Sequence, residues 1–269
     1  MVDQEREEYL SFAMKLARAA ERKIMPHFRR CAVSIKPDGT EVTAADREAE
    51  EAIRERLVDR YPDHDILGEE FGQGGIAGAA RQWLVDPLDG TASFTLGIPL
   101  FGTLIALLEE GDPVVGVIHM PAIKETLFAA RGGGCWYQEG DQEPVRVRVD
   151  PVTSLDEAYV ATGGLHGSEV EHEEGQPPYK ILDLVRAASR FRFVTDCLQH
   201  GLVCRGRLHV AVDTLMAPWD IGALVPCVEE AGGIVSNLTG QRENVAFGGS
   251  LISSASQELH EQALKTLQP

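Results

Sequence analysis

Residues 83–94, which read WLVDPLDGTASF, place two carboxylates and a hydroxyl on one short turn. The apolar start of this stretch predicts the end of a buried strand, and Pro87 cannot donate to a sheet ladder, so Asp86 lies at the strand tip. Asp89 and Thr91 follow shortly after it. Two carboxylates about 4 Å apart repel by roughly 4 kcal/mol at an effective dielectric constant near 20. The turn therefore requires a cation or a shared proton.

Hard oxygen ligands beside free backbone amides suit Mg²⁺ together with a bound phosphate. Taken alone, the same residues are equally typical of a strand end followed by an ordinary Asp-Gly turn. A calcium EF-hand is excluded, because its loop needs acids at alternate positions and a glutamate at the twelfth, whereas Pro87 and Gly97 stand in the way.

Three further acids lie at the ends of predicted elements. Glu69 follows a short predicted strand, Asp46 comes three residues after Thr43 at the start of a predicted helix, and Asp220 follows a Pro-Trp pair that opens another. Each has an ordinary alternative, because glutamate pairs are usually solvated and both aspartates occupy positions typical of helix caps. As a set, however, acids at so many strand and helix ends indicate a common site.

The elements that would position these acids follow from hydrophobic periodicity. We predict helices over 4–29, from 43 onward, and over 180–190, 196–205, 218–231 and 256–267; a hairpin over 31–42; strands at 65–67, 83–85, 158–162, 191–194, 208–213, 233–237 and 251–254; and a β-meander over 102–108, 113–120, 125–130 and 145–149. The Gly/Ala-rich stretch 72–80 predicts a mobile flap or a surface connection, and 169–178 an acidic loop.

Composition limits the classes of partner. The chain has 269 residues, 43% of them hydrophobic, and a net charge of −17. That length allows one large unit made of two packed halves, 1–150 with the acidic turn and 151–269 with the elements that would select a substrate. The negative charge argues against nucleic acid and against an anionic membrane surface, since both require clustered Lys and Arg.

The cysteine content and the N-terminal residues both indicate a cytoplasmic protein. Its five cysteines show no metal-binding spacing, and their odd number fits a reducing compartment. The acidic N-terminus resembles neither a targeting peptide nor a membrane span. We therefore expect a cytoplasmic protein without a membrane anchor.

At this point a family resemblance is evident. WLVDPLDGTASF resembles the WxxDPxDGTxxF signature of the inositol monophosphatase superfamily, and the GEE upstream and PWDIGALVPCVEEAGG downstream are similar to the family's other two motifs, in the same order. The resemblance covers about 36–233. It implies an α+β fold, the layered αβαβα sandwich of the sugar phosphatases. It also implies a Mg²⁺-dependent, lithium-sensitive phosphatase that acts on a small phosphorylated metabolite, and a homodimer.

The resemblance also implies a set of metal ligands. Glu69, Asp86 and the carbonyl of Leu88 would ligate a first Mg²⁺. Asp86, Asp89 and Asp220 would ligate a second, and a third, weaker ion would lie near Glu69. Two or three ions per site are therefore expected.

Catalytic and phosphate-binding residues follow from the same resemblance. The backbone amides of Gly90 and Thr91 would hold the phosphate. Thr91 and Asp46 would position the attacking water on the first ion, which Glu69 ligates. The expected reaction is direct in-line attack by water without a phosphoenzyme.

Substrate choice depends on residues outside the acidic cluster. The stretch IPLFGTLIALLEEGDPVVGVIHMP and the pair Asp196-Cys197 resemble the histidinol-phosphate phosphatase branch more than the inositol branch. Asp196 could accept from a cationic amine or an imidazole, and Asp213 matches a family acid that contacts polar groups of the substrate. Their ordinary alternatives are a helix N-cap and a solvated strand-end acid.

The favoured substrate is thus L-histidinol phosphate, which would place the enzyme in histidine biosynthesis. The alternatives are inositol 1-phosphate or a related sugar phosphate, and then the bisphosphates of adenosine or fructose. A non-catalytic regulatory member of the family is an alternative of another class.

Overall fold

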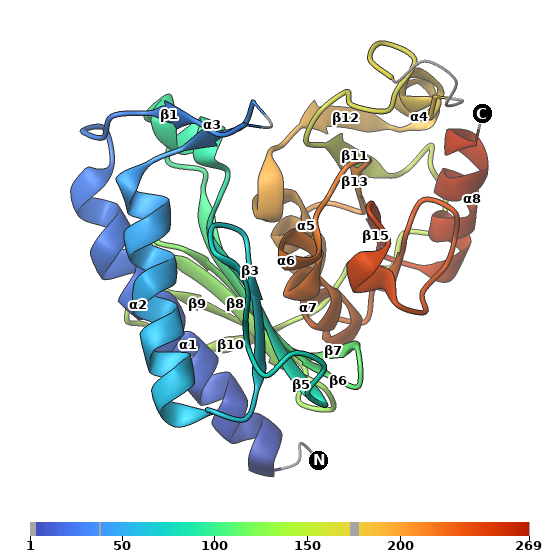
Figure 1. Ribbon diagram of the computed structural model, residues 1–269. Coiled ribbons are helices and arrows are strands. Elements are labelled where there is room, and N and C mark those ends of the chain that lie inside the picture. Colours follow the sequence, from blue (N-terminus) through green and yellow to red (C-terminus); the bar gives the residue numbers. More distant parts are fainter. Residues whose placement is uncertain (1–3, 38, 173–177, 269) are drawn as a thin grey trace.

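Helices and sheets alternate in five layers through the molecule (Figure 1). The computed structural model describes residues 4–37, 39–172 and 178–268. The helices are α1 (Gln4–Ile24), α2 (Ala44–Arg60), α3 (Thr91–Thr95), α4 (Ile181–Ala187), α5 (Asp196–Cys204), α6 (Pro218–Gly222), α7 (Leu224–Glu230) and α8 (Gln257–Leu267), with short 3₁₀ helices at Met25–His27 and Val245–Phe247.

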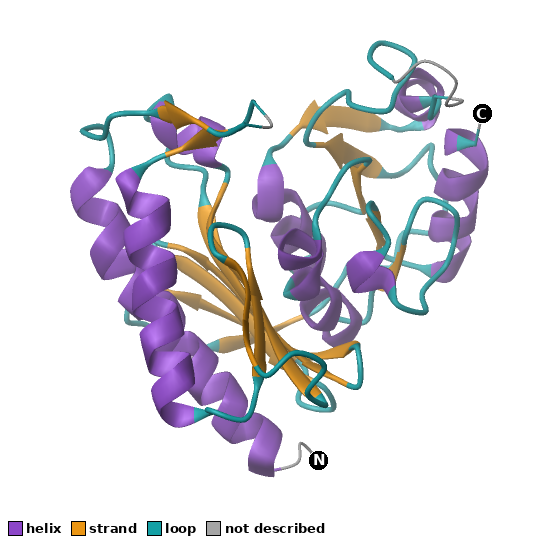
Figure 2. Cartoon of the chain, in the orientation of Figure 1, coloured by secondary structure: helices purple, strands orange, loops and turns teal. Residues whose placement is uncertain are grey.

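Two large sheets separate the helical layers (Figure 2). The first has the order β10-β9-β8-β7-β6-β5-β3-β4, the second the order β12-β11-β13-β15-β14, and β1 and β2 form a separate hairpin. The strands are β1 (Ser34–Ile35), β2 (Glu41–Val42), β3 (Asp65–Gly68), β4 (Gly72–Gly75), β5 (Arg81–Asp89), β6 (Gly102–Glu109), β7 (Asp112–Met120), β8 (Glu125–Ala130), β9 (Cys135–Glu139), β10 (Val145–Val147), β11 (Tyr159–Thr162), β12 (Arg190–Phe193), β13 (Val210–Asp213), β14 (Ile234–Ser236) and β15 (Leu251–Ser254).

The layer order confirms the predicted α+β sandwich of αβαβα type. Helices α1 and α2 cover one face of the first sheet, α5, α6 and α7 lie between the sheets, and α4 and α8 cover the second sheet (Figure 1). The division into 1–150 and 151–269 stays a prediction. The strands of the first sheet come from residues 65–147 and those of the second from 159–254.

The outer helical layer is held by apolar packing against the centre of the first sheet. Leu16 of α1 and Ile53 of α2 are fully buried in one cluster with Trp83 of β5. Burial of each such side chain contributes roughly 1.5–3 kcal/mol. This packing fixes the strand whose far end carries the acidic turn.

Glycine allows the middle layer to approach the first sheet closely. A Cβ on Gly116 of β7 would lie 2.2 Å from the carbonyl oxygen of Ala223. Ala223 is the junction between α6 and α7, so the single helix expected over 218–231 is divided. Pro226 accounts for the division, because it lacks the N–H that would donate to the carbonyl one turn earlier.

Three other expectations need correction. Gly72–Gly75, expected as part of a flap, forms strand β4, paired antiparallel with β3. Strand β9 was not predicted, since the Gly-rich turns on either side hide a short alternation of buried and half-buried residues. The first helix ends at Ile24, shortly before Pro26, because a proline disfavours helical backbone in the residue before it.

Candidate active site

A β-bulge brings the two acids of the turn to one face of the first sheet. In the pairing of β5 with β6, Asp86 lies opposite Leu104 and Asp89 opposite Gly102, so the register shifts between them. Side chains three residues apart on a regular strand point to opposite faces, and one extra residue reverses this. The hydroxyl of Thr103 donates to the carbonyl of Pro87 at 2.9 Å and holds the bulge.

The chain then turns at Gly90, whose φ of 84° is left-handed, and enters α3 at Thr91. A Cβ on Gly90 would lie 2.8 Å from Oδ2 of Asp196, so the turn passes directly beside that carboxylate. Glycine is required here both for its backbone conformation and for this close approach.

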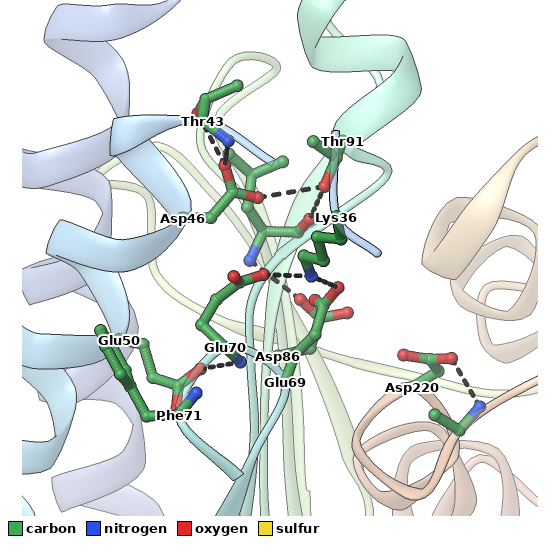
Figure 3. Close-up of polar contacts among 12 residues, drawn as sticks. Lys36, Thr43, Asp46, Glu50, Glu69, Glu70, Phe71, Asp86, Thr91 and Asp220 are labelled. Carbon is green, nitrogen blue, oxygen red and sulfur yellow. Dashed lines mark hydrogen bonds and ion pairs between the residues drawn. The ribbon is translucent and has the colours of Figure 1, made fainter. Parts of the chain in front are cut away.

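Glu69 reaches the same place from the neighbouring strand. Strand β3 runs parallel to β5, and the amide of Glu69 donates to the carbonyl of Val85 at 3.1 Å. The ammonium of Lys36 donates to Glu69 at 2.8 Å and to Glu70 at 2.6 Å (Figure 3). Lys36 therefore compensates part of the negative charge at this edge of the site.

A hydrogen bond joins Asp46 and Thr91, the two residues that are expected to position the attacking water. Oδ2 of Asp46 accepts from the amide and hydroxyl of Thr43 at 2.8 and 2.6 Å, which is a capping box on α2. Its Oδ1 accepts from the hydroxyl of Thr91 at 3.1 Å, and the carbonyl of Leu88 lies at the same distance from that hydroxyl (Figure 3). A hydroxyl has one hydrogen, so these two acceptors share it.

Asp220 approaches from the middle helical layer. It lies in the first turn of α6, and its Oδ2 accepts from the amide of Ala217 at 2.8 Å. The alternative role as a helix cap is thus observed, and Asp220 also lines the same cavity as Glu69 and Asp86.

The cavity has a volume of about 550 Å³, and most of the predicted site residues line it. Its lining includes Glu69, Asp86, Leu88, Asp89, Gly90, Thr91, Asp220 and Lys36. Asp46, Asp196 and Asp213 are not among the lining residues, although Asp46 accepts from Thr91 and Asp196 lies beside Gly90.

Burial and mutual repulsion shape the electrostatics. Burial raises the pKa of Asp86, and Glu69, Asp89 and Asp220 raise it further. Burial also raises the pKa of Asp89, and the charge on Asp196 adds to the effect. The pKa of Asp220 is raised to about 7, mainly by burial. These carboxylates require compensating positive charge to be ionised together near neutral pH.

The donor set is of the kind that Mg²⁺ prefers, namely several carboxylates and one carbonyl around a common cavity. As the side chains lie, no three His, Cys, Asp or Glu residues within 4–37, 39–172 and 178–268 are arranged around a single metal position. The reason is visible in their partners. Glu69 is turned to Lys36, and Asp89 accepts from the amide of Cys197 at 2.7 Å.

The two predicted substrate acids have different surroundings. Asp196 is the first residue of α5, and Thr195 occupies the N-cap position, so the alternative role of Asp196 as the cap is wrong. Burial raises the pKa of Asp196 to about 6. Asp213 ends β13 with a side chain only 15% exposed. It accepts from Gln199 and His200, so it is not the solvated strand-end acid of the alternative.

Sequence reasoning missed Lys36, Gln199 and His200. Lys36 precedes a Pro-Asp-Gly turn of which Asp38 lies outside the described residues, and a lone lysine there carries no signal. Gln199 and His200 lie within the predicted helix 196–205, and both are fully buried in the structure. Only their spacing of three and four residues from Asp196 could have pointed to them.

Comparison with known proteins identifies the family. The sequence model of the inositol monophosphatase family matches residues 5–269. A histidinol-phosphatase of Chlorobaculum parvum is 38% identical over 248 residues, which are 91% of this chain and 91% of that protein. A histidinol-phosphatase of Mycobacterium tuberculosis is 36% identical over 262 residues, which are 96% of this chain and 97% of that protein.

The fold agrees. An inositol monophosphatase from Zymomonas mobilis superposes with a TM-score of 0.82 at 29% sequence identity, over 98% of this chain and 99% of that one. The relationship that the three motifs predict is therefore confirmed: the chain belongs to the inositol monophosphatase family and is a phosphatase.

Proposed function

We propose that this phosphatase is a Mg²⁺-dependent phosphomonoesterase that hydrolyses L-histidinol phosphate to histidinol and phosphate. The observation that carries the choice of substrate is the position of Asp196, whose carboxylate lies directly against Gly90 in the turn that would hold the phosphate. A negative group at that point suits a substrate whose alcohol part is cationic. The two histidinol-phosphatases that are 38% and 36% identical support this choice.

The residues that would hold Mg²⁺ are Glu69, Asp86, Asp89, Asp220 and the carbonyl of Leu88. When bound, two or three Mg²⁺ ions would neutralise charge on the phosphoryl group and favour ionisation of the attacking water. The fit rests on several buried carboxylates around one cavity, whose pKa values are raised first by burial and then by their neighbours' negative charge.

The chain's own residues orient the reactants. The hydroxyl of Thr91 donates to Asp46 and Leu88, so its oxygen remains free to accept from a water molecule. A water that donates to Thr91 turns a lone pair toward the phosphorus. The backbone amides of Gly90 and Thr91 would donate to the phosphate oxygens.

In the reaction, the water oxygen forms a bond to phosphorus while the bond from phosphorus to the alcohol oxygen breaks. A proton from the water ends on the departing alcohol. No residue of the chain becomes phosphorylated in this scheme.

Phosphate release from a panel of esters tests the proposal. The panel holds L-histidinol phosphate, inositol 1-phosphate, fructose 1,6-bisphosphate and adenosine 3′,5′-bisphosphate, each with Mg²⁺ and with EDTA. We expect the highest kcat/KM for L-histidinol phosphate and no release with EDTA. Faster turnover of inositol 1-phosphate would overturn the choice of substrate, and full activity in EDTA would overturn the metal requirement.

A variant pair connects the result to Asp196. Asp196→Asn removes the negative charge, and we expect it to raise KM for L-histidinol phosphate about tenfold while changing KM for inositol 1-phosphate little. Asp183→Asn, at a half-exposed position on α4, is the matched control with one carboxylate fewer. An equal effect of both variants would remove Asp196 from substrate recognition.

Inositol 1-phosphate is the second candidate substrate, because a structure at 29% identity that covers nearly the whole chain is an inositol monophosphatase. We also propose a homodimer, as the family resemblance implies, and a cytoplasmic location, as the cysteine content and the N-terminus predict. No helix among the described residues is long and apolar enough to cross a membrane. Light scattering of the purified protein would give the oligomeric state.

A further inference from the structure

Helix α5 carries two fully buried polar residues that the proposed reaction does not use. Gln199 and His200 are both 0% exposed, and they lie one turn beyond Asp196 on the same helix face. Both donate to a single atom, Oδ2 of Asp213. The distances are 2.6 Å from Nε2 of Gln199 and 3.0 Å from Nε2 of His200. Two buried donors therefore converge on one carboxylate oxygen.

The hydrogen bonds fix the form of the imidazole. A carboxylate oxygen only accepts, so Nε2 of His200 carries the hydrogen. In the neutral imidazole, Nδ1 then accepts from the hydroxyl of Ser253 at 2.8 Å, and Ser253 is itself fully buried on β15. His200 thus connects Asp213 to the interior of the second sheet and restricts the rotation of its carboxylate.

The other oxygen of Asp213 is left available. Oδ1 receives no hydrogen bond from the described residues, and a Cβ on Gly163 would lie 2.6 Å from it. Residue 163 follows β11, which runs parallel to β13, so Oδ1 lies where these two neighbouring strands end. A side chain at 163 would cover this acceptor.

Gln199 contributes a second available acceptor. Its Oε1 is buried and has no hydrogen-bond partner. The amide cannot be reversed without directing two oxygens at each other, because its nitrogen donates to Asp213. An unpaired buried acceptor is unfavourable unless a ligand or a water molecule supplies the donor.

We propose that Gln199 and His200 are positioning residues for substrate selection. They hold Oδ2 of Asp213, so that Oδ1 of Asp213 and Oε1 of Gln199 accept from N–H groups on the alcohol part of the substrate. The substrate class is phosphate monoesters that carry a protonated amine or an imidazole. This inference rests on the proposed function, which it deepens.

Substitutions that remove one donor each test the inference. Gln199→Met keeps the length of the side chain and His200→Leu removes the imidazole, whereas His200→Gln restores an N–H near the position of Nε2. His260→Leu is the matched control, since His260 is a buried histidine bonded to two serines but not to Asp213. KM and kcat are measured with Mg²⁺ for L-histidinol phosphate and for p-nitrophenyl phosphate, which has no N–H group.

We expect Gln199→Met and His200→Leu to raise KM for L-histidinol phosphate about tenfold more than KM for p-nitrophenyl phosphate. His200→Gln should recover most of the loss, and His260→Leu should lower Tm with both KM values unchanged. Equal changes for the two substrates, or no change, would overturn the positioning role. If His200→Leu does not fold, Gln199→Met alone tests the positioning role. We expect Gln199→Met to fold, because it also removes an unpaired buried acceptor.

The wild-type protein separates this inference from the proposed function. If it prefers inositol 1-phosphate to L-histidinol phosphate, the proposed substrate fails and the N–H class fails with it. If it prefers L-histidinol phosphate and the two variants leave the substrate preference unchanged, only the positioning role fails.

Discussion

Asp220→Asn should stabilise the metal-free protein at neutral and alkaline pH. The pKa of Asp220 is raised from 3.8 to about 7, mainly by burial, with Glu69 adding to the effect. The folded carboxyl group therefore holds its proton more tightly than the unfolded one. Stability from this group is present below about pH 4 and is lost as the pH rises toward 7. Asparagine is neutral at every pH, and its oxygen can still accept from the amide of Ala217.

The size of the effect follows from the pKa shift. A change of about three units, at 1.36 kcal/mol per unit, gives roughly 4 kcal/mol at pH 8 and less than about 1 kcal/mol at pH 4. These values describe wild-type protein without divalent cations. Mg²⁺ that binds the folded carboxylates should recover much of this free energy in the wild type and less of it in Asp220→Asn.

Urea unfolding followed by tryptophan fluorescence measures the free energy of unfolding at pH 4, 6 and 8, with EDTA and with Mg²⁺. Asp63→Asn, at an exposed position between α2 and β3, is the control that removes an acid without relieving burial. The reasoning is refuted if wild type and Asp220→Asn show the same pH dependence in EDTA. It is also refuted if Mg²⁺ stabilises the two proteins equally.

Three further predictions concern other positions. Asp89→Asn should fold, since its oxygen can still accept from the amide of Cys197, but phosphate release should fall on the order of 100-fold; an unchanged rate would contradict the metal assignment. Gly116→Ala should lower the free energy of unfolding by about 2 kcal/mol, because the new Cβ meets the carbonyl of Ala223. His260, whose pKa burial lowers to about 4, should contribute stability above about pH 6.5 that is lost as the pH falls toward 4; His260→Gln should flatten that part of the unfolding curve.

The convergence of the acids could be predicted because each one lies near an end of an element. Glu69 follows β3, and Asp86 lies near the end of β5, which continues to Asp89 instead of ending at Asp86 as expected. The two strands are parallel neighbours, so these acids meet at one edge of the sheet. Asp220 begins a helix that packs on the same sheet. Position at the end of an element is visible in sequence. The convergence then follows from the topology of the fold.

Features that depend on contacts between distant segments could not be predicted. The bulge between Asp86 and Asp89 is a property of pairing with β6, and Lys36 reaches Glu69 from a separate hairpin. The pairing of Gln199 with Asp213 likewise joins a helix to a strand of the second sheet. Local periodicity reports which residues are buried, but it does not report which partner each of them meets.

For Asp46 and Asp220, helix capping and a role in the site looked like alternatives in the sequence. The structure shows that the two roles are compatible. Asp46 uses Oδ2 for the capping box of α2 and keeps Oδ1 for Thr91. Asp220 directs one oxygen at the amide of Ala217, which leaves the other to the cavity. A backbone amide that holds one carboxylate oxygen fixes the direction of the second without occupying it. Helix caps at these positions therefore favour the proposed ligand roles, because they orient the carboxylates before any cation binds.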